Sequence, residues 1–141
     1  MLISNNLKLQ ITFYFSILQL THIFFNYILS QEHNLFRVEI MEKVMRLASE
    51  KGVLIFTKSS CCLCYAVNIL FKEIGVVPAV YEIDKDPEGR EIEKAITRLG
   101  CTAPVPAVFI GGNLVGSTNE VMSLHLSGSL IPLLQQCQSL C

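Results

Sequence analysis

The stretch VLIFTKSSCCLC, residues 53–64, decides the fold. It opens with Val53-Leu54-Ile55-Phe56, a continuous apolar run that is typical of a strand buried on both faces. A short polar turn follows and leads directly into the cysteines. Beyond them, apolar residues between Ala66 and Ile74 recur at helical spacing until Gly75, which predicts a helix that ends there. The cysteines are therefore expected in the turn between a buried strand and the N-terminus of a helix.

This position suits thiol chemistry. Unpaired backbone N–H groups at a helix N-terminus stabilise a negative sulfur at Cys61, and the thiolate is the nucleophile in disulfide exchange. Lys58 adds a positive charge nearby. Cys64 follows one helical turn later, within reach of Cys61 for an intramolecular disulfide. We expect Cys61 to attack and Cys64 to be the candidate resolving cysteine, while spacing alone gives Cys62 only an accessory place.

Two other uses of the cluster are less favoured. A structural zinc site needs a second ligand pair, and no other cysteine or histidine stands at a convincing spacing. The cysteines could also be small buried residues. The redox interpretation predicts no metal ligands, and the clustering favours a reducing, cytoplasmic compartment over a disulfide framework. The roles of the remaining cysteines, including a bridge between the last two, are left open: Cys101, Cys137 and Cys141.

The remainder of the domain predicts an α/β sheet. A helix is expected over residues 44–48, ending at Gly52, and a strand over 79–83. The next helix is expected to be capped by Asp86, to have Pro87 at its first position and to end at Gly100. Strands over 107–110 and 114–115 are joined by Gly111-Gly112, and a helical region capped by residues 117–120 follows. Two parallel strands joined by a crossover helix, with a hairpin on the other edge, form a four-stranded mixed sheet flanked by helices.

The first forty residues differ sharply in composition. They hold five of the eight phenylalanines and no Cys, Gly or Pro, and no charged residue lies between Lys8 and Glu32. Residues 9–29 are long enough for a membrane span, but polar residues interrupt them and no cleavage site follows. Met41 is an alternative start. We expect an N-terminal extension at 1–40, either a mis-called start or a targeting or anchor segment, and one domain at 41–141.

The net charge of the chain argues against nucleic acid and anionic lipid surfaces as partners. The chain carries 11 basic and 12 acidic residues, for a formal net charge of −1. Such a balance predicts no long-range attraction to nucleic acid or to anionic lipid. No membrane contact is expected unless residues 9–29 are a true anchor.

From about Ala48 to the C-terminus, the pattern resembles the glutaredoxin family. The ordered set is a strand followed by Lys-x-x-Cys-x-x-Cys, then Val105-Pro106, then Gly111-Gly112, then a capped helical turn. The doubled cysteine Cys61-Cys62 is similar to that of the plant CC-type, or ROXY, group. The resemblance implies a thioredoxin/glutaredoxin fold and a glutathione-dependent thiol–disulfide oxidoreductase.

The same resemblance implies roles for individual residues. Glutathione would be the reductant, and glutathionylated or disulfide-bonded proteins the substrates, with Cys61 as nucleophile and Cys64 as its partner. The expected glutathione-binding positions are Lys58, Val105, Pro106 (in the cis form), Thr118 and Asn119. The chain departs from the usual pattern at Asn119-Glu120, where the family commonly has two aspartates, and at Cys62, which replaces a proline.

Two alternatives also follow from the resemblance. CC-type members bind TGA-type bZIP transcription factors through a C-terminal Leu-x-x-Leu-Leu motif, which Leu130, Leu133 and Leu134 fit. These leucines equally fit the buried stripe of a final helix. Such an adaptor would turn over slowly, with the nucleus as a second location beside the cytoplasm. Other glutaredoxins hold a [2Fe-2S] cluster between two subunits, and Cys61 would be the ligand here.

Overall fold

The computed structural model describes residues 2–140 and contains two compact units, one up to Val38 and one from Glu39 onward. Helix α1 runs from Leu2 to Glu50. Its last turns belong to the second unit, where Ile40, Val44 and Ala48 are buried in the core. The predicted helix before Gly52 is therefore the end of a much longer helix. The sequence analysis assigned no fold to the part upstream.

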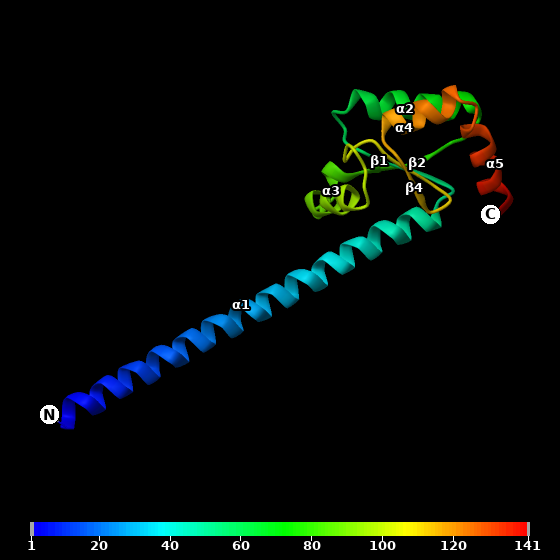
Figure 1. Cartoon of the computed structure of the whole chain (residues 1–141). Coiled ribbons are helices and arrows are strands. Elements are labelled where there is room, and N and C mark those ends of the chain that lie inside the picture. Colours follow the sequence, from blue (N-terminus) through cyan, green and yellow to red (C-terminus); the bar gives the residue numbers. More distant parts are fainter. Residues whose placement is uncertain (1, 141) are drawn as a thin grey trace. The chain divides into compact units, whose positions relative to one another are not determined.

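A four-stranded mixed sheet forms the centre of the second unit (Figure 1). The strands are β1 (Val53–Thr57), β2 (Ala79–Glu82), β3 (Ala107–Ile110) and β4 (Asn113–Gly116), in the order β2-β1-β3-β4. β1 pairs parallel with β2 and antiparallel with β3, and β3 and β4 form the hairpin. Helix α2 (Cys62–Ile74) makes the crossover between β1 and β2. These pairings confirm the predicted four-stranded mixed sheet.

Both faces of the sheet are covered, because successive side chains of a strand point to opposite sides. From β1, Leu54 and Phe56 pack with the end of α1 and with α3 (Gly89–Arg98). Val53 and Ile55 face the other way, toward α2, α4 (Thr118–Leu126) and α5 (Leu130–Leu140). All five residues of β1 are buried, and the first four, Val53–Phe56, are apolar, as expected of a strand covered on both faces. In Figure 1, α2 and α4 lie together above the sheet.

One predicted helix start was wrong. Asp86 was expected to cap a helix and Pro87 to begin it, but the chain forms a 3-10 turn, η1, over Ile83–Lys85 and α3 begins only at Gly89. The Asp86 carboxylate accepts a hydrogen bond from the Glu88 N–H at 2.8 Å and also pairs with Lys43 at 2.9 Å. These contacts hold Asp86 in the turn before the helix.

Candidate active site

The strand register brings the predicted site residues together at one end of the strands, which we call the redox edge of the sheet. Phe56 near the end of β1 pairs with Ala107 at the start of β3, and Val108 pairs with Gly116 at the end of β4. The loop after β1, the segment before β3 and the N-terminus of α4 therefore lie at the same edge. The segments brought together are 58–61, 105–106 and 117–119.

Cys61 is the N-cap of α2. Its backbone is extended (φ −91°, ψ 111°), and its Sγ accepts the backbone N–H of Cys64 at 3.4 Å. The Cys61 sulfur thus takes up one of the N–H groups that the helix leaves unpaired. Cys61 is half-buried and Cys62 is exposed, while Cys64 is only 3% exposed. The predicted position of Cys61 at a helix N-terminus is confirmed.

Cys64 lies in a very different environment from Cys61. Burial, and to a lesser extent the hydrogen bond with Cys61, together raise the pKa of the Cys64 thiol to about 12. Cys64 is therefore a neutral thiol at physiological pH.

The loop before Cys61 is held by a carboxylate that the sequence analysis missed. The Cys61 N–H donates to the Lys58 carbonyl at 3.1 Å. Both the backbone N–H of Ser59, at 3.1 Å, and its hydroxyl donate to Asp84. These bonds keep the pKa of Asp84 below its ordinary value. Asp84 lies in η1, far along the chain from the loop, so no local pattern identified it.

Lys58 has a protein partner in the structure. Its ammonium group forms an ion pair with Glu93 of α3, and the two side chains are 35% and 27% exposed. The resemblance expects a glutathione carboxylate at Lys58, so a bound ligand would take the place of Glu93. Glu93 is a second functional candidate that sequence reasoning did not identify.

The other predicted contacts lie beside the cysteine loop. The Val105-Pro106 peptide bond is cis, as the resemblance implied. Thr118 is the first residue of α4, and its Oγ1 is buried with no hydrogen-bond partner in the described chain. Asn119 is exposed. The N-terminus of α4 therefore has an exposed amide at Asn119 and, beneath the surface, an unpaired hydroxyl at Thr118.

Glu120 has a structural task in the same turn. Its carboxylate accepts the Ser117 N–H at 2.9 Å and the Thr102 hydroxyl at 3.3 Å. Hydrogen bonds from backbone N–H groups keep the pKa of Glu120 below its ordinary value. Glu120 thus closes the first turn of α4, and Asn119 is the exposed polar residue beside it.

A cavity of about 140 Å³ adjoins the two redox cysteines. Besides Cys61 and Cys64, Tyr65 and Asn68 of α2 line it, with Val80 from the edge strand β2. The Asn68 Oδ1 is buried and has no hydrogen-bond partner within residues 2–140. Helical spacing from Cys64 could have identified Asn68, which lies one turn further along α2.

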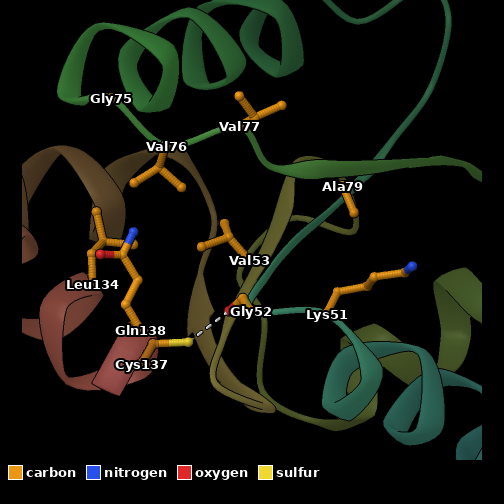
Figure 2. Close-up of a pocket in the computed structure, with 10 residues that line it drawn as sticks. All are labelled: Lys51, Gly52, Val53, Gly75, Val76, Val77, Ala79, Leu134, Cys137 and Gln138. Atoms are coloured by element: carbon orange, nitrogen blue, oxygen red, sulfur yellow. Dashed lines mark hydrogen bonds between the residues drawn. The ribbon is translucent and has the colours of Figure 1, made fainter. Parts of the chain in front are cut away.

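The other described cysteines do not line the cavity beside Cys61 and Cys64. Cys137 lines a cavity of about 350 Å³ between α5 and the start of β1, at the opposite end of β1 from Cys61 (Figure 2). Its thiol donates to the Gly52 carbonyl at 3.2 Å. Cys101 is buried, donates to the Ala103 carbonyl at 2.9 Å, and has its pKa raised by burial. The suggested bridge between Cys137 and Cys141 involves a residue outside those described.

The predicted partner-binding leucines are largely inside the domain. Leu130 and Leu134 are 0% and 3% exposed and belong to the core between the sheet and α5. Leu133 packs against the same cluster, while Ile131 is 47% exposed. The structure therefore places these leucines in the buried stripe of a final helix. Binding of a transcription factor through them stays a prediction, and it would need α5 to move.

The described residues of one chain offer few ligands for an iron–sulfur cluster. Within residues 2–140, no three His, Cys, Asp or Glu side chains are grouped as for a metal ion. Cys61 is accessible as a single thiolate ligand. A cluster at this site would draw its other ligands from outside the chain, so this alternative also stays a prediction.

Comparison with known proteins agrees with this geometry. The sequence profile of the family described as Glutaredoxin matches residues 53–115. Glutaredoxin-C13 of Arabidopsis thaliana is 71% identical over 100 residues, covering 71% of this chain and 98% of that protein. Monothiol glutaredoxin-S9 of the same plant is 69% identical over 99 residues, covering 70% and 97%. Relatives named glutaredoxin-C and relatives named monothiol glutaredoxin-S are thus about equally similar to this chain.

Solved structures lead to the same family. The buckwheat glutaredoxin–glutathione complex superposes with a TM-score of 0.69 at 30% identity, covering 72% of this chain and 93% of that one. The holo form of glutaredoxin C1 from Populus gives a TM-score of 0.67 at 32% identity, covering 70% and 98%. With this fold, the Cys61-Cys62-Leu63-Cys64 site and plant relatives of the CC type, the chain belongs to the glutaredoxin family.

Proposed function

We propose that this chain is a glutathione-dependent thiol–disulfide oxidoreductase that acts on glutathionylated or disulfide-bonded proteins through Cys61. The observation that carries the proposal is the position of the Cys61 sulfur, which caps α2 and accepts the Cys64 N–H at 3.4 Å. At this position the sulfur is half-buried and can reach a substrate disulfide, and a cysteine sulfur is the nucleophile in disulfide exchange. The glutaredoxin family, to which the chain belongs, performs this class of chemistry.

The first step transfers the glutathionyl group to the enzyme. The Cys61 thiolate attacks the glutathione sulfur of a protein–glutathione mixed disulfide, so that a bond forms between these two sulfurs and the original disulfide bond breaks. The protein's sulfur leaves as a thiolate and takes a proton from water. The substrate sulfur is thereby reduced to a thiol, and the disulfide passes to Cys61, which now forms a mixed disulfide with glutathione.

A second glutathione completes the cycle. Its thiolate attacks the glutathione sulfur attached to Cys61, releasing oxidised glutathione and restoring the Cys61 thiolate. Cys64 could instead attack Cys61 and form an intramolecular disulfide. Burial raises the pKa of Cys64 and disfavours its thiolate, which favours the route through a second glutathione. Cys64 then serves mainly as a neutral neighbour of the reacting sulfur.

Glutathione would lie along the edge that gathers the predicted contacts. The backbone of Val105, before the cis Pro106, would pair with the tripeptide, and Thr118 and Asn119 would bind one carboxylate at the N-terminus of α4. Lys58 would bind the other carboxylate after release from Glu93. A glutathione complex of the similar buckwheat glutaredoxin supports this choice of ligand.

The test is glutathione-dependent reduction of a glutathionylated peptide by the full chain. Replacing the nucleophile, Cys61→Ser, should reduce turnover to the uncatalysed background. The matched control, Cys62→Ser, removes the adjacent exposed thiol and should keep most of the activity. Turnover that survives Cys61→Ser, or a folded wild-type protein without turnover, would contradict the proposal.

A further inference from the structure

The N-terminal part of α1 contains a long apolar stretch that takes no part in the redox site. No charged residue lies between Lys8 and Glu32, and α1 is helical throughout this stretch. A helix over residues 9–31 extends about 35 Å, against a hydrocarbon core of about 30 Å. Helix α1 is also the one described helix that is long and apolar enough to cross a membrane, because it contains an 18-residue window with a mean hydropathy of 1.2.

The apolar side chains of residues 9–29 are exposed to solvent in the structure. From Leu9 to Leu29, every Leu, Ile, Phe and Tyr is at least 40% exposed, and Leu9 and Phe13 reach 68%. Soluble proteins rarely expose apolar patches of more than a few hundred Å² unless a partner or a membrane covers them. The segment therefore needs an apolar environment.

Several polar side chains that interrupt the segment are satisfied within the helix. The Thr12 hydroxyl donates to the Lys8 carbonyl at 2.8 Å, and the Thr21 hydroxyl donates to the Leu18 carbonyl at 2.9 Å. Asn26 and His22 share a hydrogen bond of 3.0 Å between Nδ2 and Nδ1. A polar group that already has a partner costs less to place in hydrocarbon than a free one. These bonds weaken the objection that the polar residues raise in the sequence.

The absence of charge in residues 9–31 favours one of the environments that could bury their apolar side chains. A helix lying flat on a membrane has a strongly charged face, and residues 9–31 have no charge at all. A two-stranded coiled coil buries only one narrow seam, which would leave most of these side chains in water. A lipid bilayer covers the whole circumference. We propose that residues 9–31 are a membrane-spanning helix that anchors the redox domain to a bilayer.

The flanking charges set the orientation. Before the segment the only basic residue is Lys8, whereas the next twenty positions after it contain Arg37, Lys43, Arg46 and Lys51. Basic residues near the end of a span stay on the cytoplasmic side. The domain therefore faces the cytoplasm, where glutathione keeps thiols reduced. This inference does not depend on the proposed redox activity.

The test uses the full chain translated in the presence of sealed endoplasmic reticulum microsomes, followed by extraction with alkaline carbonate. Most of the wild-type chain should stay in the membrane pellet. The variant Leu18→Lys/Leu20→Lys should be extracted, because each central Leu→Lys change lowers the insertion constant roughly 100- to 1,000-fold. The matched control, Leu35→Lys/Val38→Lys, changes similarly exposed residues outside the span and should behave as the wild type.

Labelling fixes the side on which the domain lies. A membrane-impermeant maleimide should label the exposed Cys62 in intact microsomes without detergent. Labelling only after detergent would overturn the orientation. The anchor itself would be overturned by a wild-type chain that carbonate extracts, by equal retention of the wild type and the Leu18→Lys/Leu20→Lys variant, or by a shortened product, which would identify a cleaved signal sequence.

Discussion

Cys61 and Cys64 lie one helical turn apart, yet their surroundings separate their chemistry. Cys61 caps α2 and is half-buried, so its sulfur can meet a substrate. Cys64 is 3% exposed and shares a hydrogen bond with Cys61. A buried thiol is stabilised in its neutral form, because burial penalises the thiolate. The difference in burial, more than the spacing, favours Cys61 over Cys64 as the proposed nucleophile.

This difference predicts how stability depends on pH. The pKa of Cys64 is about 12 in the folded protein, against an ordinary value of 9.0. Between these values the unfolded chain has lost a proton that the folded chain keeps, so the free energy of unfolding falls as pH rises. The contribution is complete below pH 9 and is lost by about pH 12, with a slope of at most about 1.4 kcal/mol per pH unit.

Urea unfolding between pH 8 and about 10.5, under reducing conditions, checks this expectation. Cys64→Ser should unfold with a shallower dependence on pH, because the serine does not titrate in this range. Cys62→Ser, which removes an exposed thiol, should keep the wild-type slope. Identical slopes for the wild type and Cys64→Ser would show that burial does not perturb Cys64 as the structure indicates.

The sequence identifies candidate site residues but not the side chains that hold them in place. Cys61 and Lys58 could be predicted because strand, turn and helix follow one another locally. Asp84, which binds Ser59, and Glu93, which pairs with Lys58, come from later elements. Their roles arise only when α3 and η1 fold back against the loop, and no spacing in the chain encodes that approach.

Among the elements, the strands were predictable and the start of α3 was not. Buried strands have short apolar runs, so Val53–Thr57 and Ala107–Ile110 could be read with little error. The start of α3 depends on Asp86, whose carboxylate interacts with Lys43 of α1 and with the Tyr81 hydroxyl. These distant partners outweigh the local preference of Asp-Pro for a helix start.

Gly89 at the start of α3 provides a test of this packing. A Cβ at Gly89 would lie 2.0 Å from the Ile83 carbonyl oxygen, so the backbone of η1 or α3 would have to move. We expect Gly89→Ala to lower the free energy of unfolding by about 1–3 kcal/mol, the usual cost of overpacking. Chemical denaturation measures the loss, with the exposed Arg90→Ala as control. Equal stability of both variants would mean that η1 and α3 are not packed this closely.

At the scale of the whole molecule, the redox domain includes the last turns of α1. Val44 and Ala48 are fully buried, and Lys43 is paired with Asp86 and Glu88 at 2.9 and 2.7 Å. Apolar spacing predicted a helix here. Its continuation upstream through an uncharged segment could not be predicted, because that segment has no amphipathic pattern with which to mark a helix face.

The position of Ile40 predicts where the domain begins. Ile40 is 3% exposed and packs in the core, and the compact unit starts at Glu39, whereas the sequence suggested a boundary at Met41. Removing a buried isoleucine side chain costs about 2–5 kcal/mol, with the lower end expected near a chain terminus. Residues 41–141 should therefore be less stable than residues 39–141 by about 2 kcal/mol, and Ile40→Ala in the longer fragment should cause most of that loss. Urea unfolding of the three proteins measures it, and Glu39→Ala, at an exposed position, is the control. If 41–141 proved as stable as 39–141, Ile40 would contribute nothing to the core and the domain would begin at Met41.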